Sequence, residues 1–167
     1  MAETNKYEIN IIGFSSKNIT AYPNINFHPL FHFKRLSWKR LLAPWKSYKM
    51  LIKVKPDLII VNTHELLEVI ILHKIIFGTK ILYDIQENYF QNILHTMAFP
   101  PVVKQVLAAY VRIREWITAP FFDYFFLAEK CYEQELTFIR NKYVVVENKA
   151  LPTTLHSKSN SPNLRLI

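Results

Sequence analysis

The chain has 167 residues, half of them hydrophobic and 14% aromatic, so it is long enough for a folded core and too apolar for a disordered chain. Its 21 Lys and Arg residues exceed its 13 Asp and Glu residues, which gives a formal net charge of +8. A single cysteine excludes a disulfide framework, and two glycines exclude a glycine-rich phosphate loop. No apolar run reaches the ~18 residues of a membrane-spanning helix, and the polar N-terminus does not have the pattern of a secretory signal.

The N-terminal third begins with two short apolar stretches. Tyr7–Phe14 is predicted to be a strand. Asn24–Leu30 is apolar, follows Pro23 and contains Pro29, which predicts an edge strand or an extended loop. Helical sequence follows as far as Val54, and Pro56 disfavours helix at the residue before it.

The positive charge is concentrated in Lys34–Lys55, here called the basic segment. It holds eight bases and no acid, whereas the rest of the chain has 13 of each. On a helical wheel its large apolar residues share one face beside a stripe of bases, and Pro44 predicts a kink or two short helices. The residues predicted to face a membrane are Arg35, Trp38, Lys39, Arg40, Lys46 and Lys49.

Three interpretations of the basic segment are open. A basic amphipathic segment bordered by tryptophan suits an anionic membrane surface. The same composition suits nucleic acid, which is the weaker interpretation because the charge is local. The third interpretation is a solvated face over an ordinary buried stripe.

From residue 57 onward, apolar runs of strand length alternate with helical segments. The predicted strands are Asp57–Asn62, Thr79–Asp84, Asp123–Ala128 and Lys142–Glu147. The predicted helices are Glu65–Phe77, Val102–Thr118 and Glu129–Ile139. This order predicts an α/β, Rossmann-like parallel sheet with helices on both faces, formed by residues 1–150. Residues 151–167 are rich in Ser, Pro and Asn and are predicted to be a linker.

Ligands of parallel α/β sheets gather at the carboxyl ends of the strands, so the residues there are the candidate site. The segment after the second strand of the repeat has the most hydrogen-bonding side chains, which suit the hydroxyls of a sugar. No histidines have metal-ligand spacing, so no metal site is predicted. The candidate site residues are His64, Glu65, Asp84, Gln86, Glu87, Asn88, Glu129 and Asn148.

Several of these residues also have an ordinary structural interpretation. Glu65 and Glu129 suit the positive end of a helix dipole, and Asp84 suits a helix cap. Asn148 suits a turn. His64 is either a loop histidine or an acid or base at a strand end.

Four stretches, in this order, resemble the N-terminal half of a GT-B retaining glycosyltransferase of family four. They are PDLIIVNTHELL, FGTKILYDIQENY, FFDYFFLAEKCYEQEL and KYVVVENK, and they cover about residues 50–150. The resemblance implies that His64 and Glu65 line the acceptor side of a cleft, and that Asp84, Gln86 and Glu87 face the transferred sugar. It also implies that Asn148 lies near the crossover to a second domain.

The chain departs from the family pattern in ways that bear on mechanism. Gln86 stands where the family usually has histidine, and glutamine cannot act as an acid or base near neutral pH. Lys149 follows Asn148 where glycine is common. Fewer residues precede Tyr7–Phe14 than the family's first strand and helix need, and the family's donor-binding domain has no counterpart. The resemblance therefore implies a chain shortened at both ends and inactive by itself.

The resemblance implies transfer of a sugar from a nucleotide diphosphate sugar to a cell-surface glycan or glycolipid acceptor. The donor would be held mainly by the absent second domain, and no cofactor is expected. The expected location is cytoplasmic, peripheral on the inner face of the cell membrane. The alternative function is a non-enzymatic basic module that binds nucleic acid or a partner protein.

Overall fold

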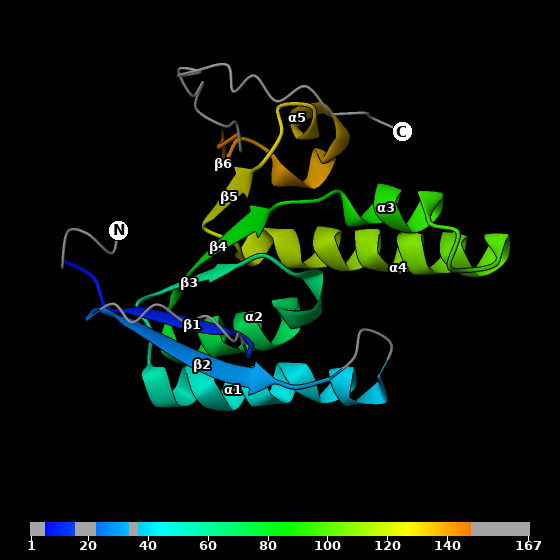
Figure 1. The fold of residues 1–167 in the computed structure, drawn as a ribbon. Helices are drawn as coiled ribbons and strands as arrows, with labels where there is room; N and C mark the ends of the chain where they lie inside the picture. Colours follow the sequence, from blue (N-terminus) through cyan, green and yellow to red (C-terminus); the bar gives the residue numbers. More distant parts are fainter. Residues whose placement is uncertain (1–5, 16–22, 34–36, 148–167) are drawn as a thin grey trace, which may run out of the picture.

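The computed structural model describes residues 6–15, 23–33 and 37–147. They form an α/β fold with a four-stranded, all-parallel sheet and a separate parallel pair of strands (Figure 1). The pair is β1 (Ile9–Phe14) and β2 (Ile25–Phe31), and the sheet is β3 (Leu58–Val61), β4 (Lys80–Ile85), β5 (Tyr124–Leu127) and β6 (Tyr143–Val145). The α-helices are α1 (Ala43–Val54), α2 (Leu67–Phe77), α3 (Tyr89–His95), α4 (Pro101–Thr118) and α5 (Tyr132–Glu135). The 3₁₀ helices are η2 (Trp38–Leu42), η3 (His64–Leu66), η4 (Ala119–Phe121) and η5 (Thr137–Ile139).

The four-stranded sheet confirms the predicted α/β class. Its strands lie in chain order, β3-β4-β5-β6. Side chains of α2 and α5 join the core on one face of the sheet, and α4 meets the same face through the Tyr83–Glu115 bond. That face is buried and carries Ile59, Tyr83 and Phe125. On the other face, four side chains are 42–48% exposed: Leu58, Ile60, Tyr124 and Val144. Helices were predicted on both faces of the sheet, whereas these connecting helices cover one face.

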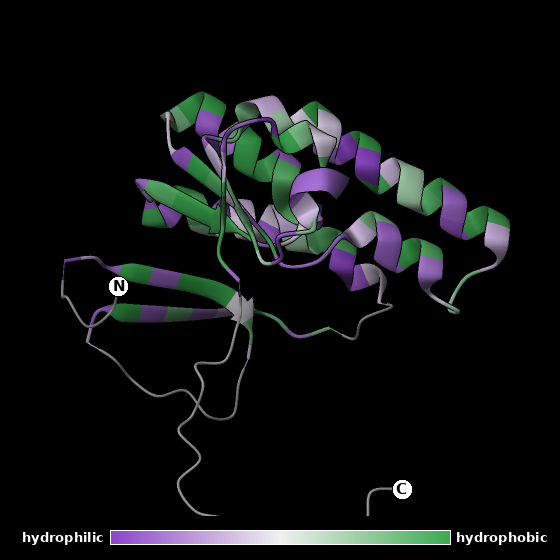
Figure 2. Ribbon diagram, turned by 90° about the horizontal axis from the view of Figure 1, so that it is seen from above, coloured by the Kyte–Doolittle hydropathy of each residue, from purple (hydrophilic) through white to green (hydrophobic). Residues whose placement is uncertain are grey.

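β1 and β2 form a pair of their own. The stretch predicted as an edge strand or loop is the regular strand β2, which pairs in parallel with β1 from Ile9–Ile25 onward. Pro29 lies opposite Gly13, and the register shifts directly after that position. Among the described residues no strand pairing joins this pair to β3, and Figure 2 shows the pair set apart from the four-stranded sheet, although Ile12 of β1 packs against the core.

In the described part of the basic segment, η2 is followed directly by α1, which confirms the prediction of two helices. Pro44 lies in the first turn of α1, where its missing N–H is not needed, so no kink results. Trp38 and Leu41 are 71% and 81% exposed, so a buried apolar stripe, the third interpretation of the basic segment, does not extend to these two residues. The 3₁₀ geometry of η2 changes the angular step, so residues 38 and 41 do not continue the buried face of α1. That buried face consists of Ala43, Ser47, Tyr48 and Leu51.

The predicted helix Glu129–Ile139 is also wrong, since only α5 and η5 form there. Leu136 between them has φ −106° and ψ 76°, outside the helical region. Leu136, Phe138 and Ile139 are all buried in the core. A continuous helix would point Leu136 and Phe138 in nearly opposite directions, so burying both requires the break.

Candidate functional site at the C-terminal edge of the sheet

The carboxyl ends of β3, β4 and β5 lie along one edge of the sheet. The strand registers pair Val61 with Tyr83 and Ile85 with Leu127, so the segments that follow these strands start at the same edge. This places seven of the predicted site residues there: His64, Glu65, Asp84, Gln86, Glu87, Asn88 and Glu129. Asn148 and Arg35 lie outside the described residues.

After β3, Glu65 is held by a base of the basic segment. Arg40 donates from Nε to Glu65 Oε2 at 2.8 Å, and its Nη2 lies 2.5 Å from Oε1, so the contact is bidentate. The Thr63 hydroxyl also accepts from the Glu65 backbone N–H at 3.5 Å. Arg40 is therefore an ion-paired cation whose side chain is still 40% exposed, and the Arg40–Glu65 pair joins η2 to the end of β3.

His64 packs beside a second aromatic ring from the next loop. Its ring meets that of Tyr89 edge-on at 4.6 Å between centroids, and the Tyr89 hydroxyl donates to the Asn62 carbonyl at 3.1 Å. Burial lowers the pKa of His64 below its ordinary 6.5, so the imidazole is neutral at neutral pH. Its enclosed Nδ1 has no hydrogen-bond partner among the described residues.

After β4, the predicted sugar-binding side chains bond to one another and to α3. Gln86 donates to Asp84 Oδ1 at 2.6 Å, so Asp84 is not a helix cap. Asn92 donates to Glu87 Oε2 at 2.8 Å, and Glu87 is exposed. The cap of α3 is Asn88, whose Oδ1 accepts from the Gln91 N–H at 3.4 Å.

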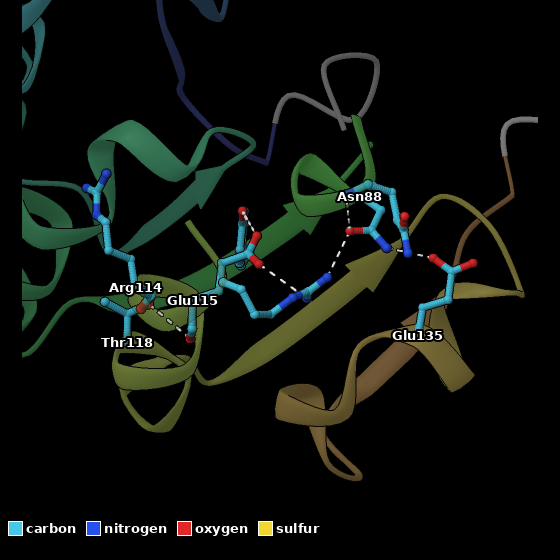
Figure 3. A network of polar contacts seen from close by, with 8 residues as sticks. Asn88, Arg114, Glu115, Thr118 and Glu135 are labelled. Atoms are coloured by element: carbon cyan, nitrogen blue, oxygen red, sulfur yellow. Dashed lines mark hydrogen bonds and ion pairs between the residues drawn. The ribbon is translucent and has the colours of Figure 1, made fainter. Parts of the chain in front are cut away.

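Asn88 also belongs to a polar network that the sequence reasoning missed (Figure 3). Arg112 of α4 donates to Asn88 Oδ1 at 2.9 Å, and Asn88 donates to Glu135 at 2.6 Å. The Tyr83 hydroxyl donates to Glu115 Oε1 at 3.3 Å, and Arg112 Nη1 lies 3.3 Å from Glu115 Oε2 without hydrogen-bond geometry. Asn88 is buried and committed to these partners, so it is left out of the proposed binding surface.

Glu115 is the most perturbed group in this network. Its residue is 3% exposed, and burial raises the pKa of its carboxyl to about 7, against the opposing effects of Arg112 and Tyr83. Burial and the neighbouring Glu115 raise the pKa of Tyr83 well above its ordinary 10. The signal available in the sequence was the pair Arg112 and Glu115, three residues apart on a helix of mostly apolar residues.

Two cavities lie away from this edge. One, of about 160 Å³, opens at the opposite edge of the sheet between Trp116, Phe125, Phe138 and Lys142. The other lies at the start of β1 and β2, beside Tyr7 and Asn24. Neither includes a predicted site residue, so the candidate site is an open surface and not one of these cavities.

The basic segment presents an exposed aromatic and cationic surface next to the candidate site. Trp38, Leu41 and Trp45 are exposed, and so are Lys39, Lys46 and Lys49. Lys49 Nζ lies 5.4 Å from the centre of the Trp45 ring. Because the Arg40–Glu65 pair connects η2 to the end of β3, this surface adjoins the C-terminal edge of the sheet.

The arrangement supplies carboxylates, an amide and a neutral imidazole for hydrogen bonds to hydroxyl groups. In residues 6–15, 23–33 and 37–147 there is no cluster of three His, Cys, Asp or Glu side chains that could hold a metal ion. Within the same ranges no helix has the length and apolar character needed to cross a membrane. In comparisons with known proteins, no family model matches the chain and no curated protein is significantly similar to it.

Proposed function

We propose that this chain is the acceptor-side domain of a GT-B glycosyltransferase that transfers a sugar from a nucleotide diphosphate sugar to a glycan or glycolipid presented at a membrane. The Arg40–Glu65 contact carries the proposal, because it links the exposed Trp38–Lys49 surface to the strand edge with His64 and Asp84. A lipid-linked acceptor needs both a surface that meets the membrane and polar groups beside it that meet the sugar.

The polar edge suits binding and positioning of an acceptor. Asp84 and Gln86 form one hydrogen-bonded unit at the end of β4, and both are part-buried, so their orientation is restricted. Positioning of an acceptor hydroxyl is a large part of what a transferase contributes to its rate. His64 is neutral and is the acid–base candidate, since Gln86 cannot take up a proton.

Acceptor binding is tested with a short polyprenyl diphosphate carrying one sugar, in detergent, with the same lipid lacking the sugar as the control ligand. We expect amide chemical shifts of residues 63–65 and 84–87 to move only with the sugar-bearing lipid. Asp84→Asn should weaken the sugar-dependent affinity about tenfold, as the loss of a charged hydrogen bond does. Asp57→Asn, an exposed acid at the start of β3, is the matched control and should change nothing.

The membrane half of the proposal is tested with vesicles of phosphatidylcholine alone and with added phosphatidylglycerol. We expect salt-sensitive binding to the anionic vesicles only, because exposed Lys39, Lys46 and Lys49 interact with surface charge over about a Debye length. Trp38→Ala should weaken vesicle binding, whereas Trp116→Ala, exposed on α4, should not.

The second candidate is a basic module that binds nucleic acid, and the same exposed lysines are the observation that favours it. Binding to short DNA or RNA duplexes with a steep salt dependence, and none to anionic vesicles, would replace the first proposal with this one. Sugar-dependent shifts at the sheet edge would be absent in that case.

A further inference from the structure

The side of α4 that faces the sheet and the side that faces solvent differ in composition, and packing against the sheet does not by itself require this difference. The side turned to the sheet buries Ala108 and Val111 together with two polar residues, Glu115 and Thr118. The side turned to solvent has no charged residue. Its large side chains are 43–72% exposed: Val102, Val103, Val106, Tyr110, Ile113, Trp116 and Ile117. This set is called the outer face of α4.

The outer face follows the spacing of helix-on-helix packing. Positions 102, 106, 109, 113 and 116 are separated by steps of four, three, four and three, the seam of a coiled coil. Ala109 lies at the middle of this seam and is small enough to let another helix approach. Figure 1 shows α4 extending beyond the sheet with α3 beside it, so much of its length is free of the strands.

The charges around the outer face do not suit a lipid surface. Helices that lie on anionic membranes carry free bases along the border of their apolar face. Here Arg114 is paired with Glu68 of α2, and Arg112 is engaged by Asn88 and Glu115. The exposed cations of η2 and α1 provide the membrane candidate elsewhere, which leaves the outer face of α4 for protein.

The size of the outer face matches one side of a stable protein interface. At their exposures these seven side chains present roughly 800 Å² of surface, about what each partner contributes to an interface of standard size. A symmetric contact uses the same patch twice, so a second copy of the chain brings a surface of equal size and composition.

We propose that the outer face of α4 packs against the α4 of a second copy, in an antiparallel, two-fold symmetric dimer. In that arrangement Ala109 lies near the axis, Val106 faces Ile113, and Val102 faces Trp116. The small Ala109 side chains let the two helices approach closely near the axis, and the two helix dipoles oppose each other. The proposal does not depend on the proposed glycosyltransferase function.

The oligomeric state is tested by analytical ultracentrifugation of the full chain from 0.1 to 100 µM. We expect a monomer–dimer equilibrium, and Ile113→Glu should weaken it at least about 30-fold, as loss of an interface hot spot does. Val106→Gln is a second, milder variant that should weaken the dimer less. Leu41→Glu, at a more exposed position on η2, should leave the dimer unchanged. Circular dichroism of each variant verifies that it is folded.

The orientation is tested by cysteine cross-linking in a Cys131→Ser background, because Cys131 is exposed. Ala109→Cys should form a disulfide-linked dimer under mild oxidation. Val102→Cys with Trp116→Cys in one chain should also cross-link, whereas Val102→Cys alone should not. A chain that stays monomeric at 100 µM overturns the proposal. Loss of vesicle binding in Ile113→Glu would also overturn the proposal, because it would show that lipid covers the outer face of α4. Cross-linking by Val102→Cys alone would overturn the antiparallel arrangement.

Discussion

The inner and outer faces of α4 reverse the usual distribution of polar and apolar residues. The inner face, against the sheet, holds a carboxylic acid and a hydroxyl among small apolar residues. The outer face, against solvent, holds valines, isoleucines, a tyrosine and a tryptophan. Surface helices normally turn their apolar stripe to the core. A hydrogen-bond network therefore contributes to the position of α4 on the sheet, while the apolar stripe of this helix faces solvent within one chain.

The inner face tolerates its polar groups because other elements bond to them. Thr118 donates to the Arg114 and Glu115 carbonyls within α4, and Tyr83 of β4 donates to Glu115. Arg112 stacks near the Phe90 and Phe138 rings while it bonds to Asn88. A buried polar group that lacks a hydrogen-bond partner lowers the stability of the folded chain, so loss of one partner on the inner face should destabilise the others. Four measurements test the contrast between the two faces.

The largest expected effect is the pH dependence of the inner face. Below pH 4.5 the Glu115 carboxyl is neutral in both the folded and the unfolded chain. Between pH 4.5 and about 7 this carboxyl ionises in the unfolded chain but stays neutral in the folded chain. The free energy of unfolding therefore falls as the pH rises through this range. The loss is complete above about pH 7 and amounts to about 3 kcal/mol. Urea unfolding of the wild type and of Glu115→Gln at a series of pH values measures it as a difference. A pH-independent difference would contradict the raised pKa.

Removing the carboxyl at low pH should cost somewhat less. At pH 5, Glu115→Ala loses the bond to the buried Tyr83 hydroxyl and leaves a small cavity, so the free energy of unfolding should fall by about 2 kcal/mol. Thermal and urea unfolding report the change. The control is Glu129→Ala, which removes an exposed acid at the C-terminal edge of the sheet and should hardly change the free energy of unfolding. An equal loss in both variants would show that the inner network has no special role.

Asn88→Ala tests whether the network extends to the candidate site. It removes the cap of α3 and the bonds to Arg112 and Glu135, which should lower stability by about 1–2 kcal/mol. Asn88→Asp keeps the cap oxygen and a partner for Arg112, and should recover part of this loss. Hydrogen exchange of α3 amides should quicken in Asn88→Ala, and unchanged exchange would remove Asn88 from the network.

The smallest effect is expected on the outer face. Ile113→Lys at concentrations where the chain is monomeric should change the free energy of unfolding by less than about 0.5 kcal/mol, because Ile113 is already exposed. Chemical denaturation at sub-micromolar protein with fluorescence detection gives this value. A loss of 2 kcal/mol or more would mean that the outer face is packed within one chain, which would undermine the contrast.

The sequence predicted most of the fold because its signals are local. Apolar runs bounded by Pro56, Gly78 and the prolines at 100, 101 and 120 placed β3, β4, α2, α4 and β5 within a few residues. Gly78 adopts the left-handed φ of 71° that its C-cap position needs. The main failure was the helix predicted over Glu129–Ile139, where burial of Leu136, Phe138 and Ile139 overrode helical periodicity.

For the candidate site, the sequence placed residues at the right edge of the sheet but not their partners. Parallel strands end together, so His64, Asp84 and Glu129 could be assigned to one edge from their order alone. The bonds of these residues join positions far apart in the chain, such as Arg40 with Glu65 and Asn88 with Arg112 and Glu135. No spacing in the sequence indicates such pairs.

Local patterns in the sequence are enough to predict the parallel α/β class, the positions of most strands and helices, and the segment that carries the excess charge. Each depends on interactions between near neighbours: apolar runs, prolines and helix caps. Three other features are visible only in the folded chain: β1 and β2 pair apart from the main sheet, Arg40 bonds to Glu65, and α4 turns its polar side inward. Those outcomes depend on contacts between distant residues, whose desolvation and pairing energies compete with the local pattern and outweigh it here.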